Sequence, residues 1–344
     1  MVIKNIKINN FRCHTDFSFQ FQKKTSVIVG ENGSGKTSVL EAIYEALRGK
    51  SFRAVDSDIL KRESDYYRIE VDFCDGEKTV VAFGDLDAGG EKKKQFLVGG
   101  KKYVRLPKKY RYPIVLFLPD DLHIISSSPT RKRDFFDRIL SELDDTYSTT
   151  LNRYEKSLKQ RNDLLKKYTE DDIEEVRSII FSWNLLLSKY GVEIRKKREG
   201  FISEINNRLT KTYRSIADND DEIEIIYNIQ GDEVSENEYF RRLENELRRD
   251  LIVGHTGFGV HRDNYNFIFN GSDADGSASR GEVRSIVLAL KFIEAELIFE
   301  KTTKRPIVLL DDVFSELDEK RQKSLTSNFK DNQVIITSVE VVKD

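Results

Sequence analysis

The segment GENGSGKT, residues 30–37, is the feature that most constrains how this chain can fold. It fits the pattern G-x-x-x-x-G-K-[ST], with a short apolar strand before it and a helical pattern after it. In such a loop, backbone N–H groups and the helix N-terminus surround a phosphate, and the lysine reaches the outer phosphates. We therefore predict a nucleotide site in which Lys36 contacts phosphate and the Thr37 hydroxyl ligates Mg²⁺. A glycine-rich turn without a ligand is the structural alternative.

The composition of the chain limits the classes of partner, metal site and membrane segment that it can have. The 344 residues include 57 Lys and Arg against 59 Asp and Glu, so nucleic acid could bind only through a local basic patch. Cys13 and Cys74 lie far apart without metal-ligand spacing, which argues against a disulfide framework and against zinc. The N-terminus has no apolar leader, and no apolar run approaches the roughly 18 residues that span a bilayer. We expect a cytoplasmic protein that does not contact a membrane.

The first hundred residues have the pattern of a sheet interrupted by one helix. Short alternating or apolar runs predict strands over residues 2–11, 16–21, 25–30, 67–73 and 78–84. The apolar positions of residues 36–49 recur at helical spacing, and Gly49 is a suitable C-cap. The Gly/Lys-rich segment 87–102 is interpreted as a solvated hairpin between short strands, in preference to a site.

From about residue 129 the hydrophobic period becomes helical. One series runs over residues 139–165 and a second over 179–209, which predicts two long helices forming an antiparallel arm. A strand and a helix are expected within residues 217–251, and strands resume at 264–271, 305–312 and 332–338. The predicted architecture is α/β, with one sheet domain split by a helical lobe. The expected parts are residues 1–128, 129–253 and 254–344.

The segment PIVLLDD indicates the second half of a nucleotide site. Residues 307–310 predict a buried parallel strand, and Asp311 at its end can support Mg²⁺. Asp312 then stands where a carboxylate can accept a proton from an attacking water. Such a strand end is common by itself, and the loop at residue 30 makes the functional interpretation stronger. In the SELD segment that follows, Asp318 closes a tight turn, with a helix N-cap at Ser315 as the alternative.

A second turn followed by a helix begins at Ser277, in SASRGEVRSIVLALKF. A helix N-terminus with a serine hydroxyl is another anion site. One phosphate loop needs only one such site, so the second makes sense if it serves a nucleotide held by another subunit. An ordinary capped helix is the alternative.

The order of these motifs resembles the ATP-binding-cassette (ABC) head of SMC-like DNA-repair ATPases. Within that group the chain is similar to the RecF family, and the resemblance covers essentially its whole length. The segments that carry the resemblance are NNFRCH, GKSFRAVDSDIL, VLFLPDDLHIISSSPTRKRDFFDRIL, GVHRDNYNF, SRGEVRSIVLALKFIEAE and VLLDDVFSELDEKR.

The resemblance implies an ABC-type P-loop ATPase head, a mixed sheet with flanking helices, split by an inserted antiparallel helical arm. ATP and Mg²⁺ are the implied cofactors, with Thr37 and Asp311 at the metal and Lys36 and Asp312 in catalysis. Ser279 and Gly281 would face the γ-phosphate held by the opposite subunit. The implied nucleotide contacts are Gly30, Glu31, Asn32, Gly33, Ser34, Gly35, Lys36, Thr37, Ser38, Ser279, Gly281 and Asp318.

The chain departs from the family pattern at several positions. Arg280 stands where the family often has glutamine. The Q-loop counterpart near residues 118–120 contains no glutamine, and the strand 332–338 is not followed by a switch histidine. His261 matches a family motif, but either a packed histidine or a catalytic one is compatible with the sequence.

We hypothesise a slow ATPase that acts as a timer, because a nucleotide shared by two subunits holds them together until it is hydrolysed. The resemblance implies a recombination mediator that acts in repair after DNA damage, with a place in the SOS response. ATP would form a homodimer on gapped or junction DNA, and hydrolysis would reset it. RecR and RecO are the implied partners in placing RecA on single strands. Arm cations could follow the DNA backbone, although charged solvent-exposed faces are usual on helices. The candidates are Lys166, Lys167, Arg195, Lys196 and Lys197.

Other classes remain as alternatives. A transporter ATPase would use a shorter insertion and a switch histidine, and a break-repair ATPase would need a long coiled coil or a Cys-x-x-Cys hook. A nuclease would require a further acidic cluster. A nucleotide-switched DNA-binding scaffold with negligible turnover, or the head of another SMC-like ATPase, is the closest rival.

Overall fold

The computed structural model describes residues 2–85, 92–231 and 235–339. The chain forms two compact units, one made of Met1–Asp121 and Glu294–Asp344 and the other of Leu122–Ile293. The first unit is thus built from both ends of the chain. The three-part division expected from the sequence, with boundaries after residues 128 and 253, stays a prediction.

A four-stranded parallel sheet forms the part of the first unit that carries the nucleotide motifs. Its strand order is β3-β13-β12-β8, and every pairing is parallel. The strand predicted at residues 307–310 is confirmed, and all of its residues are buried. The four strands are β3 Thr25–Val29, β8 Ile114–Phe117, β12 Ile307–Asp311 and β13 Val334–Ser338.

A six-stranded antiparallel sheet forms the other part of the first unit, in the order β2-β1-β4-β5-β6-β7. In β4 every second residue is buried, as the alternating sequence predicts. The predicted hairpin is present as β6 and β7, although residues 86–91 of that segment lie outside the described residues. The strands are β1 Ile3–Phe11, β2 His14–Gln20, β4 Tyr66–Phe73, β5 Lys78–Gly84, β6 Lys93–Val98 and β7 Lys101–Tyr103.

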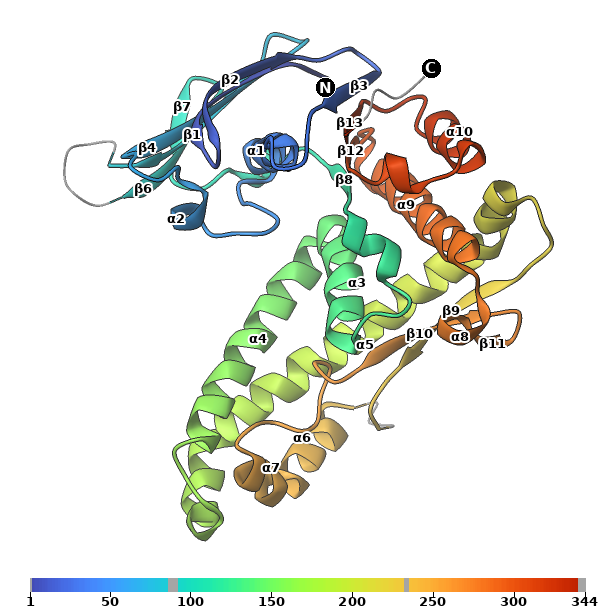
Figure 1. The fold of residues 1–344 in the computed structure, drawn as a ribbon. Coiled ribbons are helices and arrows are strands. Elements are labelled where there is room, and N and C mark those ends of the chain that lie inside the picture. Colours follow the sequence, from blue (N-terminus) through green and yellow to red (C-terminus); the bar gives the residue numbers. More distant parts are fainter. Residues whose placement is uncertain (1, 86–91, 232–234, 340–344) are drawn as a thin grey trace. The chain divides into compact units, whose positions relative to one another are not determined.

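Helix α1, Lys36–Arg48, lies between the two sheets of this unit (Figure 1). Its apolar residues join one hydrophobic core with side chains from both sheets, such as Ile69 of β4 and Leu309 of β12. The predicted C-cap is confirmed, because Gly49 adopts φ 81° and its N–H donates to the Glu45 carbonyl. The loop at residue 30 is therefore fixed to a fully packed helix.

The remaining helices that lie wholly or partly in the first unit are short, apart from α9. No helix in the described ranges is long and apolar enough to cross a membrane. These segments are α2 Asp56–Ile59, η1 Lys108–Tyr110, η2 Pro119–His123, α9 Arg280–Thr302, η4 Phe314–Glu316 and α10 Glu319–Asn328.

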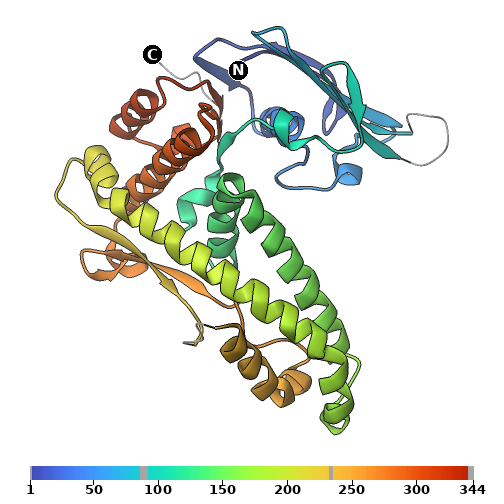
Figure 2. The same ribbon diagram turned by 180° about the vertical axis from the view of Figure 1, so that it is seen from behind.

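The second unit contains the predicted helical arm, in which α4, Asp145–Leu165, and α5, Ile173–Ala217, lie side by side (Figure 2). The short η3, Glu170–Asp172, leads from one into the other. The single helix expected over residues 139–165 is wrong, because the chain breaks at Asp144 and a separate α3, Pro129–Leu143, precedes the break. The Asp144 backbone is extended, and its carboxylate caps α4 by accepting from the N–H groups of Thr146 and Tyr147.

A separate three-stranded antiparallel sheet, β11-β10-β9, packs against α3 and α5 in this unit. The strand at residues 264–271 was predicted to return to the first sheet, and this prediction is wrong. This strand is β10, which pairs with β9 instead, and its Tyr265 and Phe267 are buried. The elements are β9 Ile223–Asn228, α6 Glu236–Asn245, α7 Leu247–Val253, β10 Asn264–Phe269, β11 Ser272–Asp273 and α8 Ala274–Ser277.

A buried arginine fastens the end of the arm. Arg161 of α4 is fully buried, and its guanidinium donates to Asp250 Oδ2 at 2.7 Å and to Thr256 Oγ1 at 2.7 Å. It also donates to Asn184 Oδ1 of α5 at 2.7 Å. One side chain thus joins α4, α5 and α7, at a position where the hydrophobic pattern alone gives no signal.

Replacing Arg161→Met should destabilise the second unit by about 3–5 kcal/mol, because it leaves the Asp250 carboxylate buried without its cation. Urea unfolding followed by fluorescence of Trp183, the single tryptophan and a residue of α5, measures this unit directly. Arg153→Met on the exposed face of α4 is the matched control and should change stability by about 0.5 kcal/mol or less. Equal effects of the two substitutions would contradict the assignment.

Candidate nucleotide-binding site

The phosphate loop follows β3 and turns directly into α1. Gly33 and Gly35 adopt φ 83° and 95°, which only glycine takes up without strain. Lys36 is buried, and its ammonium donates to the carbonyls of Gly30 at 2.9 Å and Glu31 at 3.2 Å. The ammonium is thereby held beside the loop, where a phosphate would meet it.

The turn between β1 and β2 packs against the loop so closely that position 35 has no room for a side chain. A Cβ added at Gly35 would lie 2.4 Å from Cys13 Sγ and 2.5 Å from His14 Nε2. The His14 ring also hydrogen-bonds the Gly35 carbonyl at 3.1 Å. The segment NNFRCH thus acts as a support for the loop, a role that the sequence did not specify.

Thr37 and the acidic strand end meet as the two motifs predict. Thr37 Oγ1 donates to Asp311 Oδ1 at 2.8 Å. Thr337, at the end of β13, donates to the same oxygen at 2.9 Å and accepts the N–H of Asp312 at 2.9 Å. Thr337 therefore orients both acids, a role that the sequence pattern at the end of this strand did not predict.

The two acids differ in environment. Burial raises the pKa of Asp311, and the neighbouring Asp312 charge adds to this, while hydrogen bonds from Thr37 and Thr337 oppose it. Asp312 adopts φ 51°, an uncommon conformation for a residue other than glycine. Its Oδ2 lies 3.8 Å from Lys36 Nζ. The arrangement holds one carboxylate against the Thr37 hydroxyl and the other beside the lysine.

A cavity of about 640 Å³ opens over the loop. Asn32, Gly33, Gly35, Lys36, Thr37, Ser38 and Asp312 line it. The lining also includes four cations, which are Arg12, Arg53, Lys61 and Arg62, together with the acidic Asp58. Arg12 and Arg53 lie in segments that carry the family resemblance, but isolated arginines carry no spacing signal from which a role could be predicted.

Glu41 holds two of these cations in place. This residue of α1 is fully buried and accepts from Arg12 Nη2 at 2.8 Å, from Arg53 Nε at 3.0 Å and from Ser51 Oγ at 2.6 Å. Burial alone would raise the pKa of Glu41, but the bonds from Arg12, Arg53 and Ser51 outweigh burial and lower it. Both guanidiniums are thus fixed on the cavity wall by one ionised carboxylate.

The turn at Ser279 lies at the N-terminus of α9, in the second unit. The Ser279 N–H donates to Glu282 Oε2 at 2.6 Å, and the Glu282 N–H donates to Ser279 Oγ at 3.3 Å. These reciprocal bonds are a capping box. Asp318 is itself a helix cap, accepting the Arg321 N–H at 2.9 Å. Contact of Ser279, Gly281 and Asp318 with a nucleotide stays a prediction.

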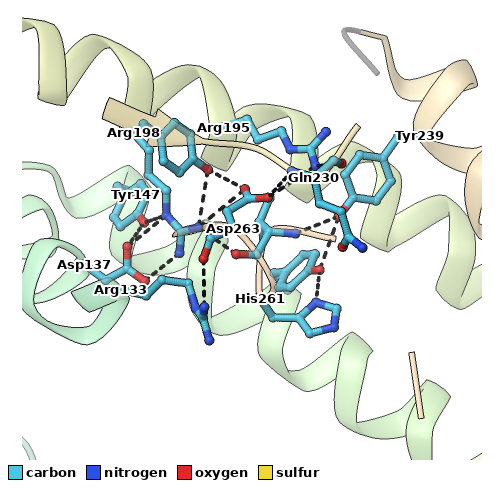
Figure 3. A network of polar contacts seen from close by, with 12 residues as sticks. Arg133, Asp137, Tyr147, Arg195, Arg198, Gln230, Tyr239, His261 and Asp263 are labelled. Carbon is cyan, nitrogen blue, oxygen red and sulfur yellow. Dashed lines mark hydrogen bonds and ion pairs between the residues drawn. The ribbon is translucent and has the colours of Figure 1, made fainter. Parts of the chain in front are cut away.

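His261 belongs to a buried polar network in the second unit (Figure 3). Its Nε2 lies 3.0 Å from the Thr256 carbonyl, which can only accept, so Nε2 carries the proton. Nδ1 then accepts from the Tyr154 hydroxyl at 2.8 Å. Burial lowers the pKa of His261 to about 4. The arrangement is that of a packed, neutral histidine.

The centre of this network is Asp263, whose carboxylate is fully buried. It contacts Arg195 at 3.4 Å and Tyr227 OH at 2.5 Å, and it accepts the Gln230 N–H at 3.1 Å (Figure 3). Arg198, one turn along α5, pairs with Asp137 at 2.7 Å. The motif GVHRDN thus supplies a structural joint between α5 and β10.

The five arm cations suggested for DNA contact are placed in different environments. Lys166, Lys167 and Lys196 are exposed. Lys197 forms an ion pair with Asp144. Arg195 is buried against Asp263, so its guanidinium does not reach the surface as DNA contact would require.

Comparison with known proteins agrees with this site. The family model described as AAA ATPase domain matches residues 1–335. The chain is 32% identical over 341 residues to the DNA replication and repair protein RecF of Lachnoclostridium phytofermentans, covering 98% of this chain and 92% of that protein. It is 33% identical over 343 residues to the protein of the same name from Clostridium botulinum, covering 98% and 92%.

The comparison with solved structures also finds a protein described as RecF. The structure described as the recombination mediator protein RecF-ATP in the RecFOR pathway aligns with TM-score 0.83 and 30% identity, covering 100% of this chain and 93% of that one. An Smc head bound to the winged-helix domain of ScpA aligns with TM-score 0.52 at 14% identity, covering 99% and 90%, and bears on the fold alone.

The phosphate loop, the acidic end of β12 and the fold together define the class of protein. It is a P-loop ATPase with an ABC-type α/β head. The sequence matches cover 98% of the chain at 32–33% identity and assign it to one family within this class. It belongs to the RecF family.

Glu41→Gln should raise the KM for ATP about tenfold with a smaller effect on kcat, because Arg12 and Arg53 lose the charge that holds them at the cavity. Glu45→Gln is the matched control, since Glu45 is also fully buried on α1 but pairs with Lys94 away from the cavity. Steady-state kinetics of both variants would separate positioning from stability. An equal KM for the two would contradict the role of Glu41.

His261 should make the second unit acid-sensitive. An unfolded histidine takes up its proton near pH 6.5 and this folded one only near 4, so stability is lost as pH falls from about 6.5 to 4. His261→Gln should flatten that loss in urea midpoints followed by Trp183 fluorescence, whereas His255→Gln at an exposed position should not. A wild-type midpoint that is equal at pH 7 and pH 5 would refute the assignment.

Proposed function

We propose that this protein is a DNA-binding ATPase of recombinational repair, in which ATP drives dimerisation and slow, DNA-stimulated hydrolysis resets it. The observation that carries the proposal is the joining of Thr37, Asp311 and Asp312 at the phosphate loop. That arrangement provides for binding phosphates and for activating water, and the relatives named for replication and repair supply the biological setting.

Mg²⁺ fits the same place. The Thr37 hydroxyl and the Asp311 carboxylate are hard oxygen donors 2.8 Å apart. Asp311 is buried with a raised pKa, so a cation beside it would restore its ionised form. When bound, the ion would neutralise charge on the β- and γ-phosphates. Asp312 would then orient the attacking water, with Lys36 on the phosphates.

Dimerisation follows from the division of the motifs. Ser279 and Gly281 would approach the γ-phosphate held by the other subunit, and Asp318 would line the same interface. The Ser279 hydroxyl oxygen accepts the Glu282 N–H, so its hydrogen is the part of the group that would bind phosphate. Neither subunit would satisfy the γ-phosphate alone, and hydrolysis would release the pair.

The DNA partner is proposed to be a gap or a junction between single and double strands. Lys166, Lys167 and Lys196 are the arm residues whose exposure fits contact with phosphates. RecR and RecO are the proposed protein partners, and the cytoplasm is the proposed location. Support comes from a similar protein, which is described as a recombination mediator in the RecFOR pathway. A scaffold with negligible turnover is the alternative, and ATP turnover with and without gapped duplex separates the two.

Asp312→Asn should bind ATP and remain dimeric, because the nucleotide is retained when water is no longer activated. Sedimentation in saturating ATP should show twice the 40.0 kDa chain mass. Lys36→Ala is the control that should stay monomeric, because it loses the phosphate contact. An Asp312→Asn protein that stays monomeric would rule out the shared site.

A further inference from the structure

The longest segment of the chain that carries basic residues and no acidic ones lies outside both the cavity and the arm. Residues 92–119 contain nine Lys and Arg and no Asp or Glu. Since 59 of the 344 residues are acidic, about five would fall in a segment of this length by chance. A positively charged segment of this length gives a chain of net charge −2 a local surface that can attract a polyanion, and its placement in the fold decides whether it is accessible.

Five of these nine cations lie on or beside the edge strand of the six-stranded sheet. β7 is the last strand of the six-stranded sheet, and the turn before it holds Gly99 and Gly100 at φ 56° and 73° (Figure 1). Two residues with positive φ make a tight hairpin that fixes the register of β6 and β7. The hairpin therefore presents Lys101 and Lys102 on a rigid support.

The short η1 helix adds to the same surface. The Tyr110 ring lies 5.9 Å from that of Tyr103 in β7, and a Cβ at Gly99 would contact the Tyr110 hydroxyl at 3.4 Å. These contacts pack residues 108–110 against the hairpin of β6 and β7. We call the exposed cations of this surface the basic edge: Lys101, Lys102, Arg105, Lys108 and Lys109.

The charges of the basic edge are largely uncompensated. Lys101, Lys102, Arg105 and Lys109 form no salt bridge with any residue in the described ranges. The contrast with Lys94 of the same hairpin is clear, since that residue is half-buried and pairs with Glu45 at 2.7 Å and Asp56 at 2.6 Å. Lysines on an edge strand can also deter sheet-to-sheet aggregation, and this alternative has to be tested.

We propose that the basic edge binds the sugar-phosphate backbone of duplex DNA, an inference that rests on the DNA-binding function proposed above. Residues 92–102, the described part of the segment predicted to be a solvated hairpin, would then belong to a site. Duplex is favoured over single strand because the tyrosines are not presented for stacking on bases. Tyr110 packs toward Tyr103, and Lys109 Nζ lies 4.7 Å over the Tyr110 ring. Contact of this kind tracks phosphates without reading sequence.

The experiment compares three pair variants of the full chain, each losing two positive charges, with wild type in ATP. They are Lys101→Gln with Lys102→Gln, Lys166→Gln with Lys167→Gln on the arm, and Lys323→Gln with Lys330→Gln at exposed positions of α10 and beyond. Affinity for a blunt duplex and for a single strand is measured from low to physiological salt.

The basic-edge pair should bind duplex about tenfold more weakly, and its salt slope should fall by about 0.9 for each lysine lost. Single-strand affinity and ATPase activity without DNA should stay at the wild-type level. The pair at residues 323 and 330 should match wild type throughout.

Three results would overturn the inference. A basic-edge pair with an unchanged duplex slope, while wild type binds, refutes it and leaves the proposed function standing. A loss confined to single strands refutes the duplex assignment. Aggregation of the variant with unchanged duplex affinity in its soluble fraction assigns the lysines to edge protection. If wild type itself binds no DNA in ATP, the proposed function fails.

Discussion

The hydrogen bond between Thr37 and Asp311 joins residues 274 positions apart, and the rest of the structure depends on it. It requires β3 and β12 to end at the same edge of one parallel sheet, as their pairing through β13 shows. Apart from β8, which belongs to the same sheet, the chain between them must therefore leave that sheet and return to it. The chain leaves after β8 and comes back through α9, so the second unit is an insertion into the first.

Helix α1 determines which cations lie on the lining of the nucleotide cavity. Because it is packed between two sheets, no face of it can carry an unpaired charge into the core. Its two buried carboxylates, Glu41 and Glu45, are therefore bound to cations from surrounding segments. The ion pairs that compensate the buried charge of Glu41 also place Arg12 and Arg53 on the lining of the nucleotide cavity.

The parts that could be predicted from sequence are those fixed by local spacing. The loop, the apolar strand with its paired acids and the helical arm each carry a periodic or positional signal. The failures have tertiary causes. The helix break at Asp144 depends on a cap, and β10 belongs to its own sheet because its partner is β9. Arg195 and Arg161 have the pattern of solvent-facing cations in sequence, but each is buried against an aspartate from a distant segment. The support at Thr337 likewise comes from a neighbouring strand that only the fold brings close.

A mixing assay tests most directly whether the ATP site is completed by a second copy. Lys36→Ala removes the loop lysine, and Ser279→Arg blocks the donated turn, so each protein alone should be inactive. In a mixed dimer both defects fall on one site and the other site is intact. An equal mixture should recover up to about half of wild-type ATPase activity, because neither variant forms a stable dimer with itself and each mixed dimer has one working site. Activity no higher than that of either variant alone would contradict a shared site.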